Sequence, residues 1–285
     1  MIDSGTALYG LLGNPVSGTR SPWIHNTVFE QLGINGAYLA FTVEEKGLAD
    51  AVRGLKALGV RGFNVTIPYK EAILPLLNRV DPLAARLGAV NTVVAEDGVL
   101  TGFNTDGPGL AAVLRRRLGS LRGLRVLVLG AGGAARGICG ALLEAGVAEL
   151  ALLNRSQARA EALVQEMGVL AGEGQVLRAL DPEAGLQPYG LVINTTSVGM
   201  EPLTDAVPVA LTGLASGAAV CDIVYKPHRT RLLQEARAAG HPVIHGIEML
   251  IEQALLAQKL WHGITDGQLA ALRHGLIAEF ERFDK

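Results

Sequence analysis

A short glycine-rich segment after a run of aliphatic residues constrains the fold of this chain more than any other feature. The segment is Gly130-Ala131-Gly132-Gly133-Ala134-Ala135, and it directly follows Val126–Leu129. The first glycine permits a tight turn, the next lets a ligand approach the backbone, and Ala135 lets a helix pack closely on the strand. Because a second hydrophobic run follows at Glu149–Leu153, the segment predicts a βαβ unit that binds a dinucleotide phosphate at its helix N-terminus.

The residues after that second hydrophobic run distinguish between two dinucleotides. NAD sites usually place Asp or Glu there to bind a ribose hydroxyl, but this chain has Asn154-Arg155-Ser156, with Arg159 one helical turn later. No carboxylate would repel a 2′-phosphate, and the Arg155 guanidinium offers charged donors and a planar surface. The alternative is a solvated arginine pair, although cations at a helix start oppose the helix dipole. The sequence therefore favours NADP.

Short hydrophobic runs alternate with longer amphipathic stretches along the chain, which predicts an α/β fold with mostly parallel sheets in two blocks. The predicted strands are Ala7–Gly13, Ala37–Thr42, Gly62–Val65, Val90–Ala95, Arg125–Leu129, Glu149–Leu153, Leu191–Asn194 and Ala219–Ile223. The predicted helices are Pro22–Leu32, Leu48–Leu58, Pro82–Leu87, Gly107–Leu118, Ala134–Ala145, Gln157–Met167, Thr230–Ala239, Ile247–Trp261 and Asp266–Phe283. Ala171–Pro188 reads as mostly loop. Two blocks predict two lobes, with the function in a cleft between them.

Composition excludes several classes of protein. Among the 285 residues, 49% are hydrophobic and 18% charged, which is too little charge for a disordered chain. The net charge is −2, and the one basic cluster, Arg115-Arg116-Arg117, is expected to complement a helix dipole, so no nucleic-acid partner is expected. Cys139 and Cys221 lack metal-ligand spacing, so no metal site is expected. Without a signal-peptide pattern or a membrane-length apolar run, a soluble cytoplasmic protein is expected.

Lys70 and Asp106 are the candidate acid/base pair. Each falls at the end of a predicted element, and a carboxylate near a lysine would hold its ammonium in place for proton transfer. A surface lysine in a turn and an aspartate that caps the next helix explain the two residues equally well. Spacing alone does not separate these two interpretations.

Several other polar residues lie at predicted strand ends or on hydrophobic helix faces. Asn64, Thr66 and Asn91 follow strands, where such residues are often turn or cap residues. Ser21-Pro22 has the pattern of a helix N-cap followed by proline. Gln253 shares a helix face with Met249, Leu256 and Leu260, so its buried amide must bond either to local backbone or to a ligand.

In order along nearly the whole chain, these motifs resemble those of shikimate dehydrogenases. The matching segments are Gly13–Asn26, Asn64–Lys70, Gly88–Thr92, Asn104–Gly107, the glycine-rich turn, Asn154–Ser156 and Gly246–Gln253. The resemblance implies reversible reduction of 3-dehydroshikimate to shikimate with NADPH, in the chorismate route to aromatic amino acids. It also implies an N-terminal substrate domain (1–105 with 247–285, since the C-terminal helices return to it) and a Rossmann-type NADP-binding domain (106–246).

The resemblance further implies a role for each matching residue. Lys70 would be the general acid/base, with Asp106 as its partner and as a ligand for substrate hydroxyls. Substrate binding would involve Asn64, the hydroxyl ligands Asn91 and Gln253, and the carboxylate ligands Thr19, Ser21, Thr66 and Tyr225. Cofactor binding would involve Gly130, Ala131, Gly132, Gly133, Ala134, Asn154, Arg155, Ser156 and Arg159, with Ile223, Gly246 and Met249 beside the nicotinamide.

One position departs from the family pattern and keeps alternatives open. The family usually has Ser-x-Ser where this chain has Thr19-Arg20-Ser21. The additional methyl group leaves quinate or an amino-substituted analogue, with NAD or NADP, as an alternative substrate. A non-catalytic NADP-binding sensor is a third hypothesis, against which the presence of Lys70 and Asp106 counts. The expected oligomeric state is a monomer or a homodimer.

Overall fold

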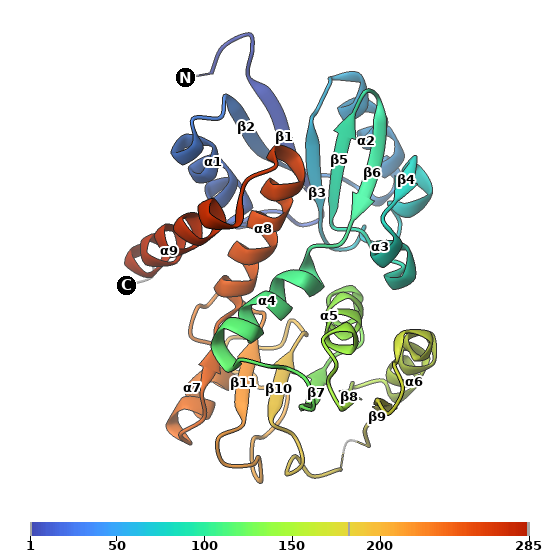
Figure 1. Cartoon of the computed structure of the whole chain (residues 1–285), viewed down its shortest axis with the longest axis vertical. Coiled ribbons are helices and arrows are strands. Elements are labelled where there is room, and N and C mark those ends of the chain that lie inside the picture. Colours follow the sequence, from blue (N-terminus) through green and yellow to red (C-terminus); the bar gives the residue numbers. More distant parts are fainter. Residues whose placement is uncertain (1, 182, 284–285) are drawn as a thin grey trace. The chain divides into compact units, whose positions relative to one another are not determined.

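The computed structural model describes residues 2–181 and 183–283. Contacts divide the chain into two compact units, and each contains a six-stranded sheet of its own (Figure 1). The first unit comprises residues 2–105 and 253–283, and the second comprises Asp106–Glu252. The predicted two-part α/β fold, with C-terminal helices that return to the first part, is confirmed. The assignment of substrate and cofactor roles to these parts, and a domain boundary at residues 246–247, stay predictions.

The sheet of the first unit has the strand order β2-β1-β3-β5-β6-β4. β1 pairs in parallel with β2 and β3, whereas β5 runs antiparallel to β3 and to β6. The strands are β1 (Ala7–Gly13), β2 (Gly36–Thr42), β3 (Gly62–Val65), β4 (Arg79–Val80), β5 (Thr92–Glu96) and β6 (Val99–Phe103). This sheet is therefore mixed, and β4 and β6 lie outside the predicted strands.

Helices cover both faces of the first sheet, because alternate residues of its strands are hydrophobic on opposite sides. Leu12 of β1 packs with Val52 and Leu55, while Tyr9 and Leu11 pack in a separate cluster that includes Phe29. The helices are α1 (Ser21–Leu32), α2 (Leu48–Ala57), α3 (Pro82–Leu87), the later part of α8 (Gly246–His262) and α9 (Asp266–Phe283), with short 3₁₀ turns at Glu45–Gly47 and Leu74–Leu76.

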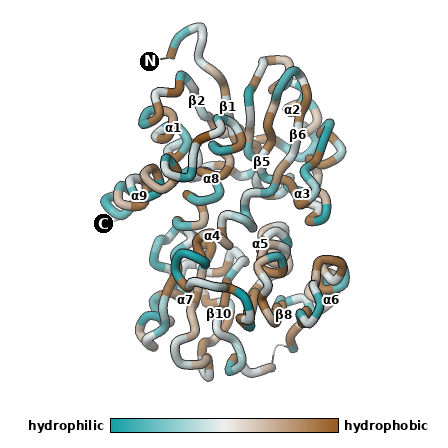
Figure 2. Tube along the Cα trace, viewed as in Figure 1, coloured by the Kyte–Doolittle hydropathy of each residue, from teal (hydrophilic) through white to brown (hydrophobic). Residues whose placement is uncertain are grey.

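The sheet of the second unit is parallel throughout, with the strand order β12-β11-β10-β7-β8-β9. The strands are β7 (Arg125–Leu129), β8 (Glu149–Leu153), β9 (Val176–Ala179), β10 (Leu191–Asn194), β11 (Ala219–Asp222) and β12 (Val243–Ile244), and the central ones are hydrophobic over most of their length (Figure 2). Since strand order reverses between β7 and β10, their carboxyl ends form the edge at which such sheets bind ligands.

The helices of the second unit are α4 (Asp106–Leu118), α5 (Gly133–Glu144), α6 (Gln157–Met167), α7 (Arg231–Ala238) and the first part of α8, with a 3₁₀ turn at Gly168–Leu170. Three of them, α5, α6 and α7, connect strands of this sheet, whereas α4 leads into β7 and α8 follows β12. The basic cluster at the end of α4 also forms ion pairs, because Arg116 contacts Glu252 at 3.1 Å and Arg117 contacts Glu248 at 3.1 Å. Within the described part of the chain, no helix combines the length and the hydrophobicity required to cross a membrane.

Candidate functional site

The loop that carries Lys70 is tied to the first sheet by backbone hydrogen bonds. The Thr66 N–H donates to the Leu12 carbonyl at 2.9 Å, and the Val90 N–H donates to the Lys70 carbonyl at 2.8 Å. Tyr69, which is buried, donates its hydroxyl to the Val43 carbonyl at 2.5 Å. Lys70 itself is half-buried. The loop therefore holds Lys70 beside the segment that leads into Asn91.

Three of the predicted substrate residues meet in a buried amide cluster. The Asn64 amide nitrogen donates to the Asn91 carbonyl at 3.2 Å, and the Asn91 amide nitrogen donates to Gln253 Oε1 at 3.4 Å. Their exposed fractions are 5%, 3% and 8%, so each side chain needs partners of this kind. The buried amide of Gln253 thus bonds to another candidate residue that lies far away in the sequence.

Three further residues belong to this cluster, although sequence reasoning did not single them out. The Asn91 Oδ1 atom accepts from the Thr105 N–H at 2.7 Å and from the Thr92 hydroxyl at 3.1 Å. Asn64 Oδ1 accepts from the Tyr38 hydroxyl at 2.7 Å. Thr92 and Thr105 lie within two of the segments that match the family, Gly88–Thr92 and Asn104–Gly107, so the sequence did contain a signal for them. Tyr38 gave no such signal, because a tyrosine in a strand is typical of a core position.

Asp106 is the first residue of α4, directly after Thr105, and its exposed fraction is 6%. A carboxylate in the first turn of a helix interacts favourably with the helix dipole. Contacts place Asp106 in the second unit and Lys70 in the first. A role for the two as an acid/base pair stays a prediction.

The hydroxyls of Thr19 and Ser21 lie next to each other. Thr19 Oγ1 donates to Ser21 Oγ at 3.2 Å and accepts from the Ser21 N–H at 3.3 Å. The N-cap residue of α1 is Arg20, and no side chain caps this helix, so the prediction that Ser21 is the N-cap is wrong. The helix starts one residue earlier than predicted, because the Arg20 carbonyl accepts the first helical hydrogen bond, from the Ile24 N–H at 3.1 Å. Thr66, the third candidate hydroxyl here, is half-buried, and its methyl group lies where a side chain at Gly13 would fall.

The glycine-rich turn joins β7 to α5 in a conformation that requires glycine at its first position, residue 130. Gly130 has a φ of +111°, and a Cβ atom there would lie 2.7 Å from the Thr195 hydroxyl. Gly132 is the extended N-cap of α5, with no atom within 4 Å of its Cβ position. Ala131 lies between them, and Gly133 and Ala134 open the helix, whose first turn contains no acidic residue. The free N–H groups of such a turn suit a diphosphate.

The segment Asn154-Arg155-Ser156 lies between β8 and α6. The Asn154 amide nitrogen donates to the Ser156 carbonyl at 2.9 Å, which fixes the turn. Arg155 and Arg159 are exposed, and the first turn of α6 contains no acidic residue. The segment therefore offers cations and no carboxylate, which fits a 2′-phosphate better than a ribose hydroxyl.

The remaining candidate residues of the second unit lie after β11 and at the start of α8. A Cβ atom on Gly246 would collide with the backbone carbonyl of Ile223, so the structure brings these two residues together. Met249 is buried in the first turns of α8, and Tyr225 is half-buried in the loop after β11.

Asp222, at the end of β11, anchors the loop that carries Ile223 and Tyr225. This carboxylate accepts from the Thr230 hydroxyl at 2.7 Å, the Asn194 amide nitrogen at 2.9 Å and the Val224 N–H at 3.0 Å. Burial raises the pKa of Asp222 to about 6, although these hydrogen bonds act in the opposite direction. Sequence reasoning did not identify this residue, since a carboxylate at a strand end is usually read as exposed.

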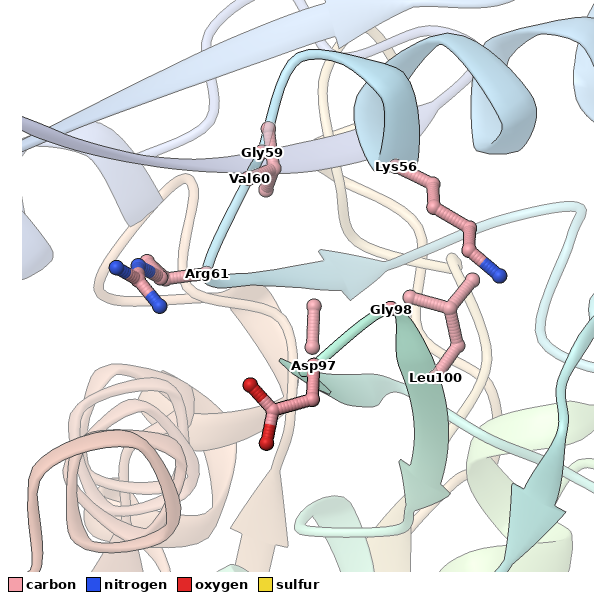
Figure 3. Close-up of a pocket in the computed structure, with 8 residues that line it drawn as sticks. Lys56, Gly59, Val60, Arg61, Asp97, Gly98 and Leu100 are labelled. Atoms are coloured by element: carbon pink, nitrogen blue, oxygen red, sulfur yellow. The ribbon is translucent and has the colours of Figure 1, made fainter.

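A surface cavity of about 280 Å³ in the first unit lies apart from the candidate residues (Figure 3). It is formed by the end of α2, the segment before β3 and the β5–β6 turn. Its lining consists of Lys56, Gly59, Val60, Arg61, Ala95, Asp97, Gly98 and Leu100. None of the residues that the sequence predicts for the site lines it.

The chain matches known proteins over both units. Residues 11–93 match a model described as the shikimate dehydrogenase substrate binding domain, and residues 112–204 match one described as shikimate / quinate 5-dehydrogenase. A shikimate dehydrogenase (NADP(+)) of Bacillus licheniformis is 45% identical over 257 residues, which cover 90% of this chain and 91% of that protein.

Two solved structures illustrate the structural similarity. Shikimate 5-dehydrogenase from Thermus thermophilus, in complex with NADP(H) and shikimate, has a TM-score of 0.84 and 38% identity, over 94% of this chain and 99% of that one. Quinate dehydrogenase from Corynebacterium glutamicum, in complex with NAD, has a TM-score of 0.86 and 31% identity, over 96% of this chain and 99% of that one.

Proposed function

Because the chain belongs to the shikimate dehydrogenase family, we propose that it reduces 3-dehydroshikimate reversibly to shikimate with NADPH, in the biosynthesis of aromatic amino acids. The observation that carries this proposal is the buried amide cluster beside the Lys70 loop. It joins Asn64, Asn91 and Gln253, three residues of separate family motifs, in one constellation. A small ligand with several hydroxyls requires such convergent amides.

The substrate residues of the proposal divide by the group they bind. The Thr19 and Ser21 hydroxyls, with those of Thr66 and Tyr225, would hold the carboxylate, and a hydrogen bond to a charged group contributes about 1.5–3 kcal/mol. Asn91 and Gln253 would hold the ring hydroxyls, and Asn64 would support Asn91 through its hydrogen bond to the Asn91 carbonyl. These residues fix the position of the ring and with it the position of the reacting carbon.

The cofactor residues of the proposal belong to the second unit. The turn 130–134 would bind the diphosphate with backbone N–H groups, and Asn154, Arg155, Ser156 and Arg159 would bind the 2′-phosphate and its ribose. Ile223, Gly246 and Met249 would line the nicotinamide, and the proposed NADP-binding domain is 106–246. NADPH, when bound, supplies the hydride for the reduction.

The protein's own contribution to the chemistry is proton transfer. In the proposed reduction, the Lys70 ammonium donates a proton from Nζ to the carbonyl oxygen that becomes a hydroxyl, and in the oxidation it takes that proton back. Asp106 would be the partner of Lys70 and would accept a hydrogen bond from a substrate hydroxyl. The proposal is that of a cytoplasmic monomer or homodimer that requires no metal and no membrane or nucleic-acid partner.

Steady-state kinetics of the purified chain with shikimate and quinate, each with NADP and NAD, test the proposal. We expect the highest kcat/KM for shikimate with NADP, followed as the increase in nicotinamide absorbance. Cofactor binding without turnover of either acid would contradict the proposal and would favour the sensor hypothesis.

A second candidate function is a quinate dehydrogenase that uses NAD. It rests on the similarity to a quinate dehydrogenase in complex with NAD and on the additional methyl group of Thr19, whereas the relatives of 45% and 43% identity are named shikimate dehydrogenases (NADP(+)) and favour the first function. The same four measurements separate the two functions, because a preference for quinate with NAD would replace the first proposal by the second.

A further inference from the structure

The Tyr38 hydroxyl lies outside every motif of the family resemblance but contacts the candidate site. Tyr38, on β2, has an exposed fraction of 0%, and its hydroxyl donates to Asn64 Oδ1 at 2.7 Å. We propose that Tyr38 is a positioning residue, which fixes the amide of Asn64 and through it the orientation of Asn91. This inference rests on the proposed function, because Asn91 must first be a substrate ligand.

The direction of the hydrogen bonds around Asn64 is determined by the backbone. The Asn91 carbonyl can only accept, so Asn64 must present its amide nitrogen to that carbonyl, at 3.2 Å. Asn64 Oδ1 then points toward Tyr38, whose hydroxyl proton it receives. If the amide of Asn64 were flipped, two carbonyl oxygens would face each other. The Asn91 carbonyl therefore selects this orientation, and the Tyr38 hydroxyl stabilises it by supplying the proton that Asn64 Oδ1 accepts.

The same logic extends from Asn64 to the predicted substrate ligands. The Asn64 amide nitrogen also donates to the Thr92 hydroxyl at 3.0 Å, which donates in turn to Asn91 Oδ1 at 3.1 Å. The backbone N–H of Thr105 donates to that same oxygen at 2.7 Å. Asn91 must therefore turn its amide nitrogen toward Gln253 Oε1, at 3.4 Å. The orientation of every amide in this chain of bonds is set.

The ring of Tyr38 is held in place by its own neighbours. It stacks on His25 with ring centroids 4.1 Å apart and an interplanar angle of 15°. His25 Nδ1 lies 2.8 Å from the Gln258 amide nitrogen on α8, and both side chains have an exposed fraction of 0%. Because α8 also carries Gln253, the cluster is tied to this helix at two positions, and the Tyr38 hydroxyl has little freedom to move.

Tyr38→Phe tests the inference, since it keeps the ring and its stacking but removes the proton given to Asn64. Leaving one buried acceptor unsatisfied is expected to raise the KM for shikimate about 5- to 30-fold, with kcat reduced less than about threefold. The affinity for NADP, measured by fluorescence titration, should not change. Tyr9→Phe is the matched control, because Tyr9 is buried in the neighbouring aromatic cluster and its KM should equal that of the wild type.

Thr92→Val is the second variant, and it interrupts the same chain of bonds one step nearer Asn91. It should raise the KM for shikimate by a similar factor, and the double variant should be no worse than the more affected single variant, because both changes act through one pathway. Should Tyr38→Phe fail to fold, an unchanged KM in Thr92→Val would still overturn the inference, because the bonds through which Tyr38 acts would then not affect substrate binding.

The outcomes separate this inference from the proposed function. A wild-type chain without shikimate turnover contradicts both. An active wild type with an unchanged KM in the folded Tyr38→Phe variant, or with additive effects in the double variant, overturns only the role of Tyr38. Equal losses in Tyr38→Phe and Tyr9→Phe would also overturn it, since they indicate a general loss of packing.

Discussion

At the scale of single residues, Arg155 is the side chain on which the proposed choice of cofactor depends. It is exposed in the turn between β8 and α6, where charge-assisted hydrogen bonds to a 2′-phosphate contribute about 1.5–3 kcal/mol. Arg155→Ala should therefore weaken NADP binding about 10- to 100-fold and leave NAD binding unchanged. Fluorescence titration with both cofactors measures this difference.

Arg237→Ala is the control for that experiment. It removes the same charge from the last turn of α7, which is also in the second unit, so it should leave both affinities near wild type. If Arg155→Ala lost as much affinity for NAD as for NADP, Arg155 would not be the residue that recognises the 2′-phosphate.

The site was predictable from the sequence wherever a residue type is unusual for its position. The Gln253 amide on a hydrophobic helix face required a partner, and the structure supplies Asn91. Thr92, Thr105 and Tyr38 are ordinary residues for a strand or loop. Their contacts become visible only after distant segments meet, and no local pattern carries that information.

At the scale of elements, the crossing of α4 and α5 depends on a glycine. A Cβ atom on Gly107 would collide with the Gly137 carbonyl and would lie 3.0 Å from the Ala141 Cβ atom. Gly107→Ala should therefore push the two helices apart and lower the free energy of unfolding by about 1–3 kcal/mol. Urea denaturation measures this change.

Gly168→Ala gives the opposite expectation in the same unit. Gly168 has a helical backbone and no atom within 4 Å of its Cβ position, so alanine there should stabilise the protein by about 0.4–1 kcal/mol. If both variants shifted stability in the same direction, steric contact at the α4–α5 crossing would not be the cause.

The strands that the sequence did not predict have different physical reasons. β4 and β12 are only two residues long, so period-two alternation has too few positions to be recognised. β9 lies within Ala171–Pro188, whose Gly, Glu and Pro content predicts loop. The β5–β6 hairpin did carry a signal, because Asp97-Gly98 adopts φ values of +48° and +74° in the tight turn that this dipeptide favours. That signal explains why β5 and β6 pair antiparallel in a sheet that alternation alone predicts to be mostly parallel.

At the scale of the whole molecule, the two units contain buried groups whose stability contributions depend on pH in opposite directions. Burial, together with the nearby His262, lowers the pKa of His25 in the first unit to about 3, whereas burial raises the pKa of Asp222 in the second to about 6. The ordinary pKa values are 6.5 for histidine and 3.8 for aspartate. The contribution of His25 is therefore present above pH 6.5 and is lost as the pH falls toward 3.

The contribution of Asp222 has the reverse dependence, because it is present below pH 3.8 and is lost as the pH rises toward 6. The free energy of unfolding of the wild type, His25→Phe and Asp222→Asn at pH 7, 5.5 and 4 tests this difference. The difference between wild type and variant should fall with acid for His25 and rise with acid for Asp222, by at most about 1.4 kcal/mol per pH unit. Parallel curves would contradict the assignment of these pKa values.

The two-part organisation of the molecule was predictable because two blocks of strand and helix alternation precede the C-terminal helices. The pattern alone did not say where those helices pack, since a helix without a following strand has no fixed place in a βαβ series. The family resemblance supplied that answer, and contacts assign Gln253–Phe283 to the first unit.

The central claim is that Lys70 moves the proton in the reduction of 3-dehydroshikimate, and the kcat of Lys70→Ala tests it most directly. Loss of a general acid/base should lower kcat about 10²- to 10⁴-fold with an unchanged affinity for NADP. Lys56→Ala, an exposed lysine on α2 in the same unit, should keep the kcat of the wild type. A kcat of Lys70→Ala close to that of the wild type, in a variant that still folds and binds NADP, would contradict the claim.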